Sequence, residues 1–180
     1  MGLFDKLTAA FSGATPDYAA EIAGATDDSG DTVLAFSRCL PAAYTRGGAA
    51  GTLSVDGVLL SKAIAAVQNK AAGAKHVAGD ADSIARTLTQ DADLRVLALG
   101  QNRITWWDFG MSGTQPPAEL VQSVSRDDVA SIVDTGKRAQ GGTLVTRFTF
   151  TDGSAFDYRL LQPSDDFWTV AAGYPRTPAA

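Results

Sequence analysis

The sequence predicts an α+β domain built around an antiparallel β-barrel or bent sheet, with a C-terminal helix and additional N-terminal helices. Two observations lead to this fold class. Over the second half of the chain, short apolar segments alternate with turn residues, which is typical of antiparallel strands. Segments with the apolar spacing of helices come before and after them.

Six strands are expected in the second half, at residues 94–99, 103–109, 120–124, 130–135, 143–151 and 154–161. Asp152-Gly153 joins the last two and is the strongest hairpin signal, because Gly accepts the positive φ of a tight turn. Alternation then pairs three side chains of each strand on one half-buried face: Thr146, Phe148 and Phe150 with Phe156, Tyr158 and Leu160.

Residues 1–30 are expected to form a helical extension. Within it, one apolar stripe at helical spacing contains Leu3, Phe4, Leu7 and Phe11. Two interpretations of the stripe stay open: it packs on the protein's own core, or it anchors the chain to a lipid surface or a partner. A second helix is predicted over 16–23, with Thr15 as N-cap and Pro16 in its first turn.

Residues 31–174 are expected to form a single domain that starts with a strand over 32–38. A helical insertion at about 57–90 would contain a core-packing helix over 58–72 and a short helix beginning near Ser83. Near the end of the domain, an N-cap, two acidic residues and the stop at Gly173 predict the closing helix. Residues 175–180 are expected to be a flexible tail.

Composition limits the class of protein. The 180 residues are 45% hydrophobic and 19% charged, which suits one folded core. A net charge of −5 argues against a nucleic-acid partner. Cys39, the only cysteine, excludes an intramolecular disulfide, and the N-terminal residues lack the pattern of a signal peptide. We therefore expect a cytoplasmic protein, or one peripheral to the inner face of the membrane.

Residues 97–106 resemble the hairpin that marks bacterial pleckstrin-homology-like (PH-like) domains, in which an arginine, here Arg103, opens the second strand. Residues 148–154 resemble the family's final hairpin before its closing helix. The resemblance covers about residues 93–172. It implies a PH-like barrel and a binding or scaffolding role, and such domains share no catalytic residues.

The sequence contains no pattern typical of catalysis, a cofactor or a metal site. His76, the only histidine, and Cys39 do not form a zinc-ligand set, and no serine stands in a nucleophile turn. Three acidic clusters, at residues 27–31, 80–82 and 91–93, lack the spacing of an EF-hand and are expected to be turns and helix caps. A small hydrolase would require a deep pocket with carboxylates around His76.

A basic cluster is the best candidate for an anion or lipid contact. Lys137 and Arg138 are expected in a hairpin loop, beside Arg147 on the outer face of the next strand. The same three cations are also what an ordinary soluble hairpin contains.

The neighbouring residues Trp106 and Trp107 must face opposite sides of their strand. If Trp106 enters the core, Trp107 and Phe109 face outward and form a candidate partner-binding surface. The other interpretation is that an N-terminal helix or the helix over 58–72 covers them.

The sequence thus predicts a non-enzymatic protein-interaction or scaffold module of PH-like type that needs no cofactor. The alternative is a peripheral membrane or lipid-binding protein that uses the stripe of Leu3, Phe4, Leu7 and Phe11.

Overall fold

The computed structural model describes residues 16–25, 31–43, 75–88, 93–110, 114, 117–139 and 142–175. These ranges contain the strands β1 (Val33–Pro41), β2 (Val77–Ala78), β3 (Arg95–Gly100), β4 (Arg103–Asp108), β5 (Glu119–Ser125), β6 (Val129–Arg138), β7 (Leu144–Phe150) and β8 (Ala155–Leu161). They also contain the helices α2 (Tyr18–Ala25), α4 (Ile84–Thr87) and α5 (Phe167–Ala172), and the 3-10 turn η1 (Arg126–Asp128). The predicted helix over 58–72 lies outside the described residues.

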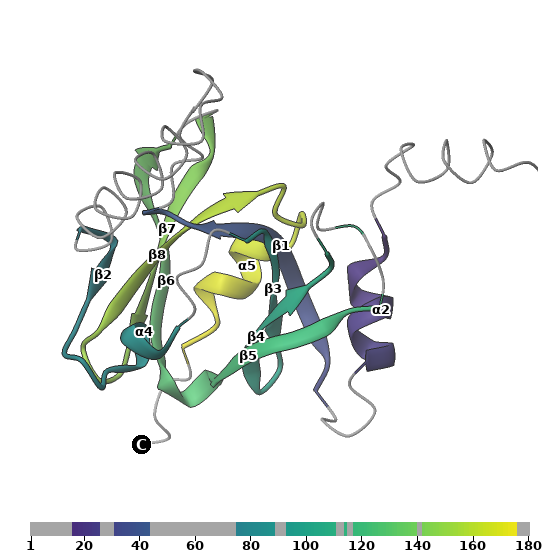
Figure 1. The fold of residues 1–180 in the computed structure, drawn as a ribbon, viewed down its shortest axis with the longest axis horizontal. Coiled ribbons are helices and arrows are strands. Elements are labelled where there is room, and N and C mark those ends of the chain that lie inside the picture. Colours follow the sequence, from purple (N-terminus) through teal and green to yellow (C-terminus); the bar gives the residue numbers. More distant parts are fainter. Residues whose placement is uncertain are drawn as a thin grey trace, which may run out of the picture.

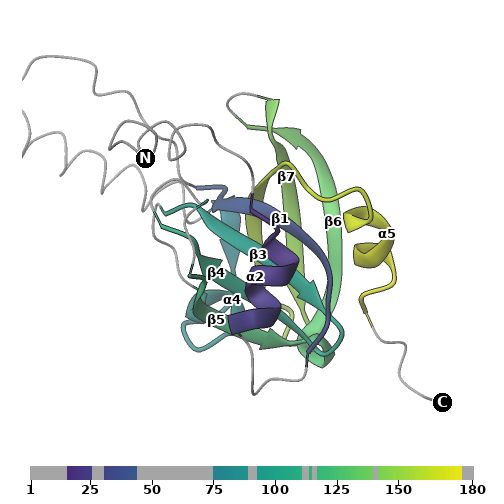
Figure 2. The same cartoon turned by 90° about the vertical axis from the view of Figure 1, so that its right-hand side faces the viewer.

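The strands form one antiparallel sheet in the order β5-β4-β3-β1-β8-β7-β6, and β2 pairs with β8 beside this path. The sheet bends around its core but does not close, so β5 and β6 remain its two edges (Figure 1). In Figure 2, α2 lies over the strands β1 and β3, and α5 lies beside β6. The predicted α+β fold with an antiparallel bent sheet and a C-terminal helix is confirmed.

β1 joins the two halves of the sheet. Its first part pairs with β3, and its last four residues, 38–41, pair with β8. β2 then pairs with the next stretch of β8, through Val77 opposite Phe156. β1 and β2 therefore pair with the same strand, and β2 lies within the predicted insertion at about 57–90.

The main core lies inside the bend of the sheet, and α5 packs against it through Phe167 and Ala171. β7 pairs with β8 as predicted, with Thr146 opposite Tyr158 and Phe148 opposite Phe156, but Leu160 lies opposite Leu144 rather than a residue of the predicted set. The expectation of a half-buried pair is wrong for β8. Its outward side chains Asp157 and Arg159 are buried as well.

A second apolar cluster lies on the outer face of the sheet, under α2. Tyr18 and Ile22 of this helix pack with Val96, Ala98, Trp107, Phe109 and Ala118. The predicted helix over 16–23 is confirmed, but it begins two residues later. Asp17 occupies the cap position, since its Oδ1 accepts a hydrogen bond from the backbone N–H of Ala20 at 3.1 Å.

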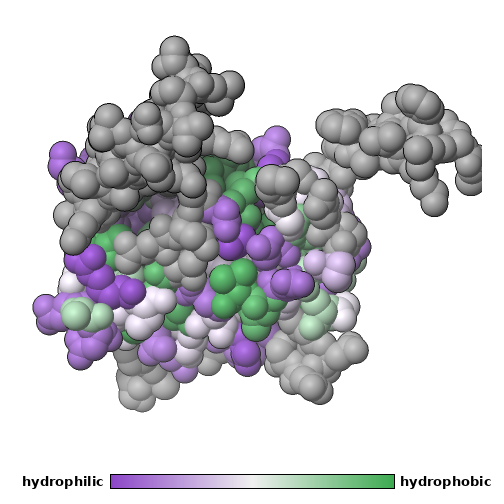
Figure 3. All heavy atoms as spheres, in the orientation of Figure 1, coloured by the Kyte–Doolittle hydropathy of each residue, from purple (hydrophilic) through white to green (hydrophobic). Residues whose placement is uncertain are grey.

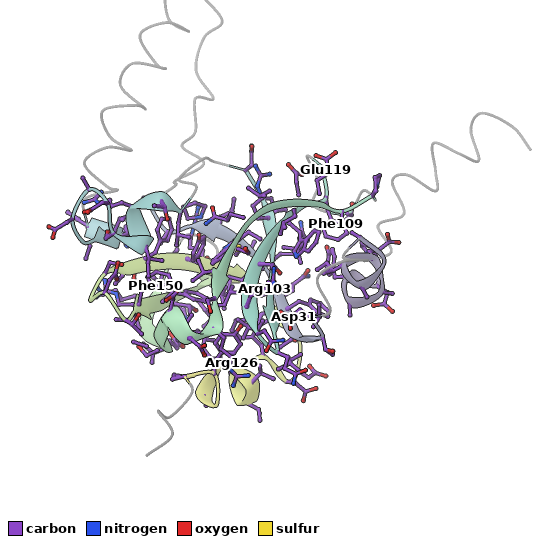
Figure 4. All side chains as sticks on the ribbon, turned by 90° about the horizontal axis from the view of Figure 1, so that it is seen from below. Asp31, Arg103, Phe109, Glu119, Arg126 and Phe150 are labelled. Atoms are coloured by element: carbon purple, nitrogen blue, oxygen red, sulfur yellow. The ribbon has the colours of Figure 1, made fainter. Side chains whose placement is uncertain are left out.

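Arg126 lies in η1, between the edge strands β5 and β6, and binds two other segments of the chain. Its guanidinium donates to the carbonyl oxygens of Tyr174 (2.7 Å), Gly173 (2.7 Å) and Gln101 (3.1 Å). It also lies 4.7 Å from the centroid of the Tyr174 ring. Figure 4 shows Arg126 next to the end of α5. One side chain thus joins η1, the β3–β4 turn and the C-terminal helix.

The β7–β8 turn supports α4 from a distance in the sequence. Asp152 Oδ2 accepts from the backbone N–H of Ile84 at 2.8 Å, and Ser154 Oγ accepts from that of Ala85 at 3.1 Å. Ser83 is the N-cap residue of α4 but makes no capping bond through its side chain. Hydrogen bonds from Ser154 and Ile84 lower the pKa of Asp152 below its usual range.

We predict that Asp152→Asn reduces the loss of unfolding free energy at acidic pH. Because the folded pKa of Asp152 is lowered, its contribution is present above the ordinary value of 3.8 and is lost as the pH falls through the folded pKa. Urea unfolding between about pH 6 and about pH 3 should show a smaller loss of unfolding free energy in the variant than in the wild type. Asp82→Asn, at an exposed aspartate near α4, is the control and should behave like the wild type.

Candidate functional site

The edge strand β5 contains an irregularity beside the two tryptophans. Trp106 pairs with Gln122, but Trp107 pairs with Leu120, so Val121 has no partner residue on β4. This is a β-bulge, a device that bends an edge strand and redirects its side chains. Leu120 and Val121 line two different hollows, one on each face of the sheet.

The outer hollow lies between α2 and the sheet. It encloses about 320 Å³, including the part open to solvent, and is lined by Ile22, Asp31, Val33, Gly100, Arg103, Thr105, Trp107 and Leu120. Trp107 is 1% exposed, and its indole N–H donates to Thr105 Oγ1 at 2.7 Å. Leu120 is 51% exposed and lies beside the apolar side chains of Ile22, Val33 and Trp107 that line the same hollow. Figure 3 shows apolar residues among hydrophilic ones over β4 and β5.

The structure corrects the predicted partner-binding surface. Trp107 and Phe109 do face outward, but they are only 1% and 0% exposed because α2 covers them. The ring of Tyr18 meets that of Phe109 edge-on, with 5.0 Å between the centroids. The N-terminal helix is therefore the cover, and Leu120 is the apolar side chain left exposed beside it.

The inner hollow lies on the concave side of the sheet. It encloses about 250 Å³, including the part open to solvent, and is lined by Cys39, Pro41, Arg95, Trp106, Val121, Gln122 and Tyr158. Arg95 pairs with Asp108 at 2.7 Å and with Asp93 at 3.1 Å. Burial raises the pKa of the Cys39 thiol far above its ordinary value, so the thiol stays protonated and is a poor nucleophile.

The three predicted anion-contact residues do not form one cluster of free cations. Lys137 and Arg138 belong to β6 rather than to a loop, so that expectation is wrong. Arg138 pairs with Asp134 at 3.2 Å. Arg147 binds Asp157 through two hydrogen bonds of 2.7 and 3.0 Å, which raise the pKa of the guanidinium.

Asp157 is also the partner of His76. Its Oδ2 lies 3.1 Å from His76 Nδ1, and its backbone oxygen accepts from the N–H of Ala42 at 2.8 Å. Asp157 therefore holds both ends of the segment between β1 and β2. Arg147 neutralises the charge of Asp157. The cluster therefore joins β7, β8 and the two ends of the segment between β1 and β2.

Asp31, from the first acidic cluster, supports a nearby turn. Asp31 accepts hydrogen bonds from the backbone N–H groups of Asn102 (2.9 Å) and Arg103 (3.1 Å), and so supports the β3–β4 turn. Figure 4 shows Asp31 beside Arg103. Among the described residues, no three His, Cys, Asp or Glu side chains come together as metal ligands. Leu3, Phe4, Leu7 and Phe11 lie outside the described residues, so the membrane anchor stays a prediction.

Gly100 allows Asp31 to reach this turn. A Cβ at residue 100 would press on the Asp31 carboxylate and lie 2.9 Å from the carbonyl oxygen of Arg103. We predict that Gly100→Ala lowers the unfolding free energy by about 1–3 kcal/mol, because the overpacked turn must shift. Gly24→Ala, in α2, is the control. No heavy atom lies within 4 Å of its added Cβ, and helix propensity should make it neutral or stabilising by up to about 1 kcal/mol. If Gly100→Ala and Gly24→Ala changed the unfolding free energy in urea equally, the role given to Gly100 would be contradicted.

Within the described ranges, no helix has the length and apolarity needed to span a membrane. Comparisons of the chain with protein-family models, with curated proteins and with solved structures found no match.

Proposed function

We propose that this chain is a non-enzymatic protein-interaction or scaffold module of PH-like type. The resemblance implies a PH-like barrel with a closing helix. The bent antiparallel sheet, although open, and the helix α5 support the proposal. Fold alone does not determine function, so the choice depends on the surface.

The observation that supports binding most directly is the exposure of Leu120 at the rim of the outer hollow. Three large apolar side chains of the described residues are exposed: Leu34 (41%), Val133 (47%) and Leu120 (51%). Of these, Leu120 lines a described hollow, beside the apolar side chains of Ile22, Val33 and Trp107. Burying a fully exposed leucine contributes roughly 1.5–3 kcal/mol, so covering the exposed half of Leu120 would contribute about 1 kcal/mol to binding.

The bulge influences how a partner would bind. Bulges protect edge strands from simple strand addition, because they interrupt the row of backbone groups. We therefore expect the partner to insert an apolar side chain into the outer hollow next to Leu120, with side-chain contacts at its centre. Arg103, at the same hollow, would add a polar contact at the rim.

The proposal is tested by photo-crosslinking in the native cell. A photoreactive amino acid is placed at Ser123, an exposed position of β5, or at Ala130, an exposed position of the opposite edge strand β6. We predict a discrete adduct from position 123 and none of the same mass from position 130.

Two matched substitutions then decide whether the adduct depends on the proposed surface. Leu120→Asp should remove the adduct formed at position 123, whereas Val133→Asp, at a similarly exposed residue of β6, should leave it unchanged. Circular dichroism should show that both variants fold. An adduct that survives Leu120→Asp, or that both variants remove equally, would contradict the proposal.

A further inference from the structure

The helix α2 covers only part of the outer face of the sheet. It lies over β1 and β3 (Figure 2), and its Ile22 reaches the wall of the outer hollow. Beyond it, on the edge strand β5, Leu120 is 51% exposed and Ser123 is exposed as well. Both side chains lie on the outer face, because Leu120 is opposite Trp107 and Ser123 is opposite Thr105. The outer side of β5 is therefore an uncovered strip beside α2.

The spacing of the strands matches a second helix at this strip. Packed helices lie about 8–10 Å apart, and neighbouring strands lie about 4.8 Å apart. A helix packed beside α2 would therefore lie two strands away from it. Since the sheet order is β5-β4-β3-β1, two strands from β1 and β3 means β4 and β5, where Leu120 is exposed.

The chain that precedes α2 can supply this helix. Its apolar stripe at helical spacing consists of Leu3, Phe4, Leu7 and Phe11. These residues lie outside the described ranges. The linker from Phe11 to Tyr18 spans at most about 25 Å when extended, whereas α2, with 8 residues, is about 12 Å long. Gly13 and Pro16, which lie in this linker, are typical of a change of chain direction. The stripe can therefore reach any part of the strip.

The other long segment outside the described ranges begins and ends farther away. Residues 44–74 connect to the sheet at β8, where Asp157 binds Ala42 through its backbone and His76 through its carboxylate. In the sheet order β8 is four strands from β5, a distance of about 19 Å. The stripe, which is tethered directly to α2, is the nearer occupant.

The small size of the exposed surface also favours an occupant from the same chain. Covering the exposed half of Leu120 changes a binding constant only about fivefold. A tethered segment can use so small a gain, because the tether removes most of the cost of association. A separate partner needs further contacts to bind at the same place.

We propose that residues 1–12 dock with their apolar stripe on the outer side of β4 and β5, beside α2, and cover Leu120. The stripe then occupies the surface where the proposed partner binds, and it regulates access to that surface. The docking stands without the proposed function, whereas its regulatory consequence rests on the proposed function.

The docking is tested by photo-crosslinking of the purified full chain in the absence of any partner. A photoreactive amino acid at Ser123 should give an adduct of monomer mass, and mass spectrometry should locate the second peptide within residues 1–15. The same group at Ala130, on the opposite edge strand β6, is the control and should give no adduct with these residues. An adduct of Ser123 with residues 44–74, or only with a second copy at dimer mass, would overturn the proposal.

Two variants decide whether the apolar side chains of the stripe cause the adduct. Leu7→Ser combined with Phe11→Ser should lower the yield of the intramolecular adduct at least about fivefold. Ala9→Ser, on the opposite side at helical spacing, should leave it unchanged. Equal yields from the two variants would contradict the proposal. Loss of the wild-type adduct on addition of phosphatidylcholine and phosphatidylglycerol vesicles would also overturn it, because the stripe would then be a membrane anchor.

The regulatory consequence is measured in the native cell. Leu7→Ser combined with Phe11→Ser should raise the yield of the partner adduct at position 123 by about twofold or more, because the surface is free more often. If a partner adduct forms but does not increase, the regulation is wrong and the proposed function stands. If no partner adduct forms, the proposed function and the regulation are both wrong, and the purified chain alone decides the docking.

Discussion

Two tryptophans in succession on one strand impose the main constraint on this fold. Trp106 and Trp107 point to opposite faces of β4, so both faces of the sheet must be covered with apolar side chains. Trp106 lies in the core inside the bend of the sheet, where α5 also packs, and α2 covers Trp107 on the outer face. A single helix or a single layer would leave one of these large rings in water. The N-terminal helix therefore completes the second face of the sheet.

Polar contacts hold the strands in the arrangement that this double cover requires. Asp31 supports the turn that leads into β4, and Arg126 ties that turn to the end of α5. At the other end of β4, the bulge at Val121 separates the outer hollow from the inner one. The two hollows differ chemically. The outer one has an exposed leucine at its rim, and the inner one has the paired guanidinium of Arg95 in its wall.

The strands and the closing helix could be predicted from the sequence, because alternation, turn residues and helix caps are local signals. Asp152-Gly153 is an example: it predicts the hairpin that joins β7 to β8, although the loop that forms has three residues, 151–153, with Phe150 opposite Ser154. Which face of the sheet is covered by a helix from a distant part of the sequence could not be predicted in the same way. Alternation places Trp107 and Phe109 on the outer face, but it does not say that Tyr18 lies over them.

The candidate site was harder to predict than the fold, because its residues meet only through long-range packing. The exposure of Leu120 depends on how much of the outer face of the sheet α2 covers. The sequence alone makes Arg147 a candidate anion contact. Its partner Asp157 lies on the next strand, and only the β7–β8 register brings the two together. The register that places Arg147 opposite Asp157 comes from the three-residue loop 151–153, which the two-residue signal Asp152-Gly153 does not predict.

The most direct test of the double-cover account is the unfolding free energy of a Tyr18→Ala, Ile22→Ala double variant, measured with the tryptophan emission spectrum. Both side chains are almost fully buried against the outer face. Truncating large buried residues costs about 2–5 kcal/mol each, so we predict a loss of at least about 4 kcal/mol and a red-shifted emission as Trp107 meets water. Glu21→Ala, on the same helix, should change little. A loss below about 1 kcal/mol with an unshifted emission would contradict the account.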